Sequence, residues 1–61
     1  MTWELYEVWA VDEDGYEELI DTTKSLKEAR QLAKEQLTEG AVEVILYREV
    51  NDELEVFERL K

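Results

Sequence analysis

The chain of 61 residues contains no cysteine, no histidine and no proline, and only two glycines. Without cysteine it can form neither disulfides nor thiolate metal sites. Without histidine it lacks the usual general base near neutral pH, and it also lacks the commonest metal ligand, the imidazole ring. Basic residues are also scarce, because 7 Lys and Arg stand against 17 Asp and Glu. These absences exclude several ways of stabilising a small domain and several kinds of active site.

The length of the chain predicts a single domain over residues 1–61 with a thin core. A chain of this size buries only about 60% of the surface that its unfolded form exposes. With disulfides excluded, oligomerisation or close packing is left to stabilise it. The segment that follows Met1 has neither a basic region nor the apolar run of a secretory signal, and no stretch is long enough to span a membrane. We therefore expect a cytoplasmic domain that does not bind membranes.

The net charge of −10 is unevenly distributed along the chain. Residues 1–23 hold eight acidic residues and no lysine or arginine, whereas residues 24–40 hold four basic and three acidic residues. Such a surface repels nucleic acid and anionic membranes, and it attracts basic proteins. Solubility is the plain interpretation of this charge. The sharper interpretation is an acidic surface that docks on a basic site by imitating the phosphate spacing of DNA.

Apolar residues make up 44% of the chain, and their periodicity indicates a folded protein despite the charge. Segments rich in β-branched and aromatic residues predict four strands, at 3–11, 16–22, 41–50 and 53–60. The turn cluster between the first two strands ends in Gly15, which can take the positive φ of a short hairpin loop. Asn51 and Asp52 are typical of a two-residue loop between the last two strands. The strands should therefore pair as two antiparallel hairpins.

A helix is predicted between the hairpins. Ser25 and Glu28 fit a capping box, in which Ser25 accepts from the Glu28 amide and Glu28 returns a bond to Ser25. Gly40 stands where a C′ glycine belongs, so the helix should end near Glu39. A narrow apolar stripe with Leu32 at its flank should face the core. The stripe consists of Leu26, Ala29, Ala33 and Leu37.

The order ββαββ predicts an α+β fold, a four-stranded antiparallel sheet with one helix packed across one face. Strand order does not follow from the sequence. Because a covered face should be apolar, and because this choice avoids burying Glu7, we place six residues on the helix side: Tyr6, Val8, Ala10, Val44, Leu46 and Val56. The other face then carries Trp3, Leu5, Trp9, Ile45, Tyr47 and Phe57 among carboxylates. If the first strand is flipped, Tyr6 and Val8 become exposed instead, and a partly apolar open face survives.

The aromatic residues on this open face have two interpretations. They can be ordinary surface side chains shielded by their neighbours, since most protein surfaces are more than half apolar. Alternatively they form a contact surface, either a homodimer face or a site for a protein partner with a basic surface, because Trp and Tyr are typical interface anchors. The candidate partner-binding residues are Trp3, Trp9, Tyr47, Phe57, Glu7, Asp12, Asp14, Glu17 and Glu18.

The sequence holds no pattern that favours catalysis, and we predict no enzyme activity, no cofactor and no metal site. Asp12, Asp14, Glu17 and Glu18 offer oxygen ligands, but the twelve-residue pattern of a calcium loop is missing and a hairpin turn explains the same residues. Ser25 is the only serine, is already assigned as a cap, and has no histidine partner. Neither a glycine-rich phosphate loop nor a basic-aromatic RNA motif is found, so direct binding of nucleic acid is not expected.

The segment Thr23-Lys24-Ser25-Leu26-Lys27-Glu28-Ala29, which enters a helix between two hairpins, resembles small ββαββ proteins encoded by phages and other mobile elements. Some of these, including certain anti-CRISPR and anti-restriction inhibitors, are acidic and block the binding site of a host protein. The resemblance covers the whole chain as a pattern without a diagnostic motif, so it assigns no functional residue. It implies a small acidic protein-binding module, an inhibitor that occupies a basic nucleic-acid-binding site on a host protein.

The alternative is a stand-alone structural mini-domain, orphan or designed, with no partner or activity. The complete capping box and the well-placed Gly40 favour this alternative, and so does the absence of proline, cysteine and histidine. The uneven charge and the exposed tryptophans speak against it, because a designed surface usually avoids both.

Overall fold

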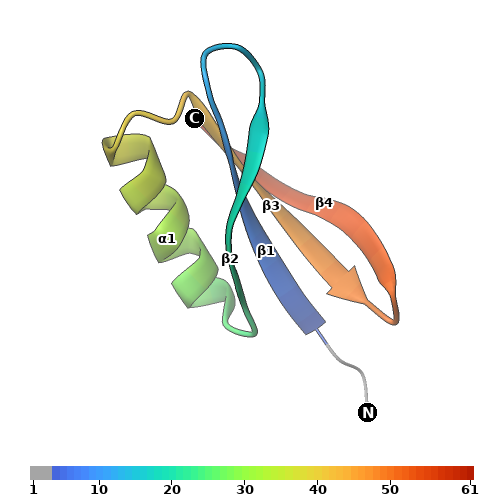
Figure 1. Ribbon diagram of the computed structural model, residues 1–61. Coiled ribbons are helices and arrows are strands. Elements are labelled where there is room, and N and C mark those ends of the chain that lie inside the picture. The colour runs from blue at the N-terminus through green and yellow to red at the C-terminus, as the bar shows by residue number, and fades with distance from the viewer. Residues whose placement is uncertain (1–3) are drawn as a thin grey trace.

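The computed structural model describes residues 4–61, which form four antiparallel strands and one helix (Figure 1). The elements are β1 (Glu4–Val11), β2 (Glu17–Thr23), α1 (Leu26–Thr38), β3 (Glu43–Val50) and β4 (Glu53–Leu60). The strands make one sheet in the order β2-β1-β3-β4, so β1 and β3 are central and β2 and β4 are edges. The predicted α+β fold of ββαββ order is therefore confirmed.

Both hairpin turns are closed by the local chemistry of their own residues. In the first turn, Oδ1 of Asp12 accepts hydrogen bonds from the backbone N–H of Asp14 (2.9 Å) and of Tyr16 (3.0 Å). Gly15 has a φ of 86°, a conformation that other L residues rarely adopt. In the second turn, Asn51 and Asp52 both have positive φ, 51° and 66°. This is the requirement of a type I′ turn, whose twist matches that of the flanking strands.

The start of α1 confirms one half of the predicted capping box and corrects the other. The Ser25 hydroxyl accepts from the Glu28 amide at 3.2 Å, as predicted. The returning bond does not reach Ser25 directly, because the Thr23 hydroxyl lies between the two groups. That hydroxyl accepts from the Ser25 amide (3.1 Å) and donates to Oε2 of Glu28 (3.2 Å). A hydroxyl can accept and donate at once, so Thr23 relays the bond.

The end of α1 also explains why β3 starts later than predicted. Gly40 has a φ of 115° and donates its N–H to the Leu37 carbonyl, while the Ala41 N–H donates to the Gln36 carbonyl. These two bonds form a Schellman motif, which ends the helix on the predicted glycine. Because Ala41 is part of this motif, the strand begins at Glu43 instead of residue 41.

The core lies between α1 and the sheet face that we predicted. Ala29 and Ala33 are fully buried, and they pack in one cluster with four sheet residues, Tyr6, Val8, Val44 and Leu46. The alanines have the smallest side chains that helices favour, so they let the helix axis lie close to the sheet. Leu26, Leu32 and Leu37 pack at the margin of this cluster, which confirms the predicted stripe.

In β4 the predicted faces of Val56 and Phe57 are wrong, because the register shifts beside them. Leu46 pairs with Glu58, but the next residue, Tyr47, pairs with Val56, so Phe57 is an extra residue on β4. Such a β-bulge reverses the alternation of side chains on one side of it. Phe57 therefore packs against the helix-side core, with its ring 5.5 Å from that of Tyr6. Val56 points to the other face and is 48% exposed.

Candidate protein-binding face

The face of the sheet opposite α1, here called the open face, is partly apolar. Because side chains alternate along a strand, Trp9 and Tyr47 lie on this face together with the residues paired beside them. Its apolar members are Leu5, Trp9, Val11, Leu19, Ile45, Tyr47, Leu54 and Val56. Its charged members are Glu7, Glu17, Glu43, Glu49 and Arg59.

Three apolar side chains of the open face are exposed to solvent, and sequence reasoning missed all three. They are Leu19 (46% exposed), Leu54 (52%) and Val56 (48%). Leu19 lies opposite Trp9 because β2 has its own register shift, which leaves Ile20 as an extra residue that packs against the core. For Leu54 a signal was available, because the two-residue Asn51-Asp52 loop pairs Val50 with Glu53 and so places Leu54 opposite Glu49. The shifts beside Leu19 and Val56 have no local sequence signature.

The centre of the open face is an aromatic pair. The rings of Trp9 and Tyr47 meet edge to face, with centroids 6.0 Å apart and planes at 80°. Ile45, the cross-strand neighbour of Trp9, is only 4% exposed and is not part of the helix-side cluster. Neighbouring side chains of the open face therefore cover Ile45.

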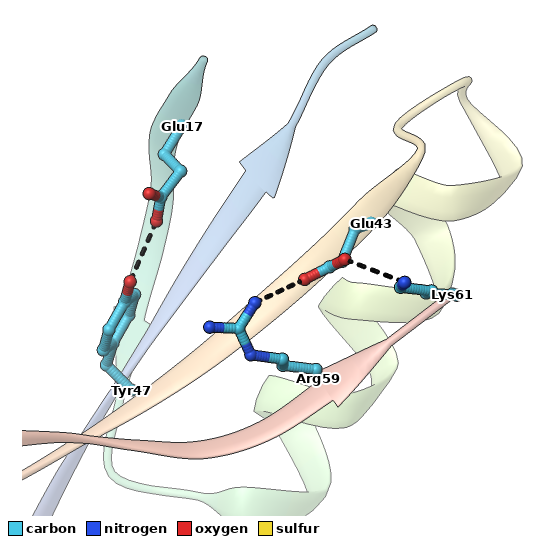
Figure 2. A network of polar contacts seen from close by, with 5 residues as sticks. All are labelled: Glu17, Glu43, Tyr47, Arg59 and Lys61. Atoms are coloured by element: carbon cyan, nitrogen blue, oxygen red, sulfur yellow. Dashed lines mark hydrogen bonds and ion pairs between the residues drawn. The ribbon is translucent and has the colours of Figure 1, made fainter. Parts of the chain in front are cut away.

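Each ring of the pair is bonded to a carboxylate. The indole N–H of Trp9 donates to Oε1 of Glu7 at 2.9 Å. The Tyr47 hydroxyl donates to Oε1 of Glu17, also at 2.9 Å, and this bond spans from β3 to β2 (Figure 2). Both bonds leave the negative charge of the carboxylate in place, because a neutral donor does not neutralise it. The aromatic pair therefore lies between two anions.

The pKa of the Tyr47 hydroxyl reflects this environment. The hydrogen bond to Glu17 raises the pKa above the ordinary tyrosine value, because it stabilises the protonated hydroxyl. Partial burial and the negative charges of Glu17 and Glu7 raise it further, while the positive charge of Arg59 lowers it. The charges that act on the Tyr47 hydroxyl are therefore those of Glu17, Arg59 and Glu7.

A second polar cluster connects β3 to β4 and the C-terminal Lys61 (Figure 2). Oε1 of Glu43 accepts from the Arg59 guanidinium at 3.0 Å, and Oε2 of Glu43 lies 3.6 Å from Nζ of Lys61. The Glu43 side chain is only 16% exposed, and two cations therefore compensate it. This cluster joins β3 to the end of β4.

The structure brings together four of the predicted binding residues, namely Trp9, Tyr47, Glu7 and Glu17. Phe57 is placed on the opposite face by the β4 bulge, which corrects the prediction. Trp3 lies outside the described residues.

The remaining three predicted residues lie away from the aromatic pair. Asp12 uses Oδ1 to close the first turn, and Asp14 is exposed in the same turn. Glu18 is exposed on β2 but pairs with Ala10, so it lies on the helix-side face.

Within residues 4–61, no cluster of acidic side chains has the arrangement needed to hold a metal ion. In the same range no helix is long and apolar enough to cross a membrane.

Comparisons of the chain with protein-family models, with curated proteins and with solved structures find no match. The resemblance to phage-encoded inhibitors stays a prediction.

Proposed function

We propose that this chain is a small acidic protein-binding module whose open face docks on a protein surface with an apolar centre and a basic rim. The observation that carries the proposal is the combination of exposed Leu19, Leu54 and Val56 with the Trp9–Tyr47 pair on one face. The described residues place no second layer over that face.

The aromatic pair has the properties of an interface anchor. Trp and Tyr dominate the binding energy of many interfaces because they bury a large area with few rotatable bonds. Here both rings are already held by carboxylates, at 2.9 Å in each case. A side chain that is ordered before binding loses less conformational entropy on binding. The partner therefore meets a preformed surface.

Charge selects a basic partner over a second copy of this chain. The open face carries four glutamates and one arginine, and Arg59 is bonded to Glu43. Two copies placed face to face would bring like charges together, which disfavours association. A partner with Lys and Arg around an apolar patch would complement both the rim and the centre. A standard interface takes about 800 Å² from each protein, roughly a fifth of the 4463 Å² surface of this chain.

A protein surface that binds nucleic acid has the required rim, since lysine and arginine line such surfaces to contact phosphates. A module docked there excludes the nucleic acid and acts as a competitive inhibitor. We expect this module to release a labelled oligonucleotide from the partner, which is measured as a fall in fluorescence anisotropy. A partner that binds the module and its oligonucleotide together would contradict inhibition but not docking.

The docking face is tested with matched variants immobilised as baits for basic proteins. Val56→Glu places a charge on the open face at a side chain that is already exposed. Gln31→Glu makes the same charge change on the exposed surface of α1. The proposal expects a partner that wild type and Gln31→Glu retain, that Val56→Glu loses, and that added salt elutes.

Two outcomes would contradict the proposal. One is a partner whose retention is indifferent both to Val56→Glu and to salt. The other is a dimer that light scattering detects at tens of micromolar and that Val56→Glu dissociates, because the open face would then belong to a second copy of the chain.

A further inference from the structure

The two faces of the sheet each carry an aromatic pair, and the helix-side pair has a cation of its own. Tyr6 and Phe57 meet edge to face, with centroids 5.5 Å apart and planes at 71°. The guanidinium of Arg48 lies over the Phe57 ring, 5.3 Å from its centroid. Nε and Nη2 of Arg48 also both donate to Oε1 of Glu55. The helix-side set is therefore an edge-to-face pair, a carboxylate and an arginine.

The open-face set has the same parts except the arginine. Trp9 and Tyr47 meet edge to face, and Glu7 and Glu17 supply two carboxylates. Among residues 4–61, no lysine or arginine takes the place over either ring that Arg48 takes over Phe57. Arg59 is the basic residue that the open face carries, and its guanidinium donates a hydrogen bond to Glu43.

We propose that the Trp9–Tyr47 pair, with Glu7 and Glu17 beside it, receives an arginine side chain of the protein partner. This assignment rests on the proposed function, because it names the residue that anchors the partner to the open face. The structure already contains one example of the required geometry, in Arg48 on Phe57. A partner's arginine would repeat it on the opposite face of the sheet.

The chemistry favours arginine as the occupant. A guanidinium is attracted to an aromatic face, most strongly to that of tryptophan, and the attraction grows when solvent is excluded. Each carboxylate uses one oxygen for its aromatic donor, so the second oxygen of Glu7 and of Glu17 can accept from the guanidinium. Arginine presents five donors in a planar fork, whereas lysine is a strongly hydrated point charge.

The test uses two blocked tripeptides, Val-Arg-Val and its nearly isosteric twin with citrulline, whose neutral urea group replaces the charged guanidinium. The full chain is titrated with each peptide, and the NMR signals of the Trp9 indole N–H and of the Tyr47 ring are followed. We expect saturable changes at both side chains, with the arginine peptide binding at least tenfold more tightly than the citrulline peptide. Binding should also lower the pKa of Tyr47, because a nearby cation stabilises the tyrosinate.

Matched variants separate the site from the overall charge. The double variant Glu7→Gln with Glu17→Gln should reduce the affinity for the arginine peptide at least tenfold. The control, Glu35→Gln with Glu53→Gln, makes the same change in net charge at exposed positions and should leave the affinity within about twofold. Far-ultraviolet circular dichroism checks that both variants are folded.

Three results would overturn the assignment. The first is equal affinity for the arginine and citrulline peptides. The second is an equal loss of affinity for the arginine peptide in the two double variants. The third is an affinity for a Val-Lys-Val peptide equal to that for the arginine peptide. These failures are distinguishable from failure of the proposed function. A partner protein lost by Val56→Glu but unaffected by Glu7→Gln with Glu17→Gln would keep the docking face and remove the arginine anchor.

Discussion

The two hairpins of this protein use their acidic residues in opposite ways. In the second hairpin three of the six carboxylates form ion pairs: Glu43 with Arg59 and Lys61, Glu55 with Arg48, and Glu58 with Arg30 of α1. In the first hairpin, Glu7 and Glu17 accept hydrogen bonds from the neutral donors Trp9 and Tyr47.

Carboxylates therefore serve two roles within a single sheet. Carboxylates of the second hairpin hold β4 to β3 and α1. On the open face, Glu7 and Glu17 of the first hairpin bond neutral donors and contribute negative charge beside the aromatic pair. The acidic residues of β2 also suit its position as an edge strand. It is exposed along most of its length and carries Glu17, Glu18 and Asp21. Charged edge strands resist pairing with further copies of themselves.

The largest change in stability should come from disrupting the buried core in which both hairpins pack against α1. Leu46 is fully buried between α1 and the centre of the sheet. Leu46→Ala removes that packing and leaves a cavity, so we expect a loss of about 2–5 kcal/mol in unfolding free energy, measured by urea denaturation. Leu54→Ala, at a side chain that is 52% exposed on β4, is the control. It should change stability by roughly 0.5 kcal/mol or less. Equal losses in the two variants would contradict the assigned core.

A smaller effect is expected at the junction between the hairpins, where α1 begins. Ser25→Ala removes the acceptor of the Glu28 amide, and the expected loss is about 1 kcal/mol in unfolding free energy. Thr23→Val should also destabilise the protein, because Thr23 relays the bond between Ser25 and Glu28. Thermal melts that match the wild-type curve in both variants would show that the helix is capped in another way.

Charge reversal should affect the hairpins in opposite directions. Glu13→Lys with Glu18→Lys relieves repulsion in the first hairpin at exposed side chains, so we expect a gain of roughly 0.2–1 kcal/mol at low salt. Glu43→Lys in the second hairpin should destabilise the protein, because it places a third cation beside Arg59 and Lys61. Denaturation at low and high salt tests both signs, since screening should shrink the two effects. A loss of stability in the first variant would contradict the comparison.

The smallest effect concerns the bond between Tyr47 and Glu17. The pKa of Tyr47 is raised in the folded protein above the ordinary value of 10.0, so folding favours the protonated hydroxyl. Its contribution to stability is therefore fully present below about pH 10 and is lost as the pH rises through the folded pKa. Glu17→Gln should move this pKa back towards its ordinary value, measured by tyrosinate absorbance. An unchanged titration in the variant would remove Glu17 as the main cause.

Much of the local structure follows from short stretches of sequence. Ser25 caps α1, Gly40 ends it, and Asn51 with Asp52 turns the second hairpin, because each acts through bonds or dihedral angles within a few residues. The helix stripe and the helix-side residues of β1 and β3 also follow, since periodicity alone separates the faces of a regular element. For the candidate site, the same reasoning places Trp9 and Tyr47 on the open face.

The rest was decided by tertiary structure. The strand order that lets Tyr47 of β3 reach across β1 to Glu17 of β2 depends on contacts between residues 30 positions apart. The extra residues Ile20 and Phe57 are set by packing, because a bulge lets each side chain join the core while its neighbour turns outwards. A single shift of this kind reverses a face, which is why Phe57 left the predicted site and Val56 entered it. The sequence determines the elements and their caps, whereas burial against neighbouring strands determines which side chains the open face presents.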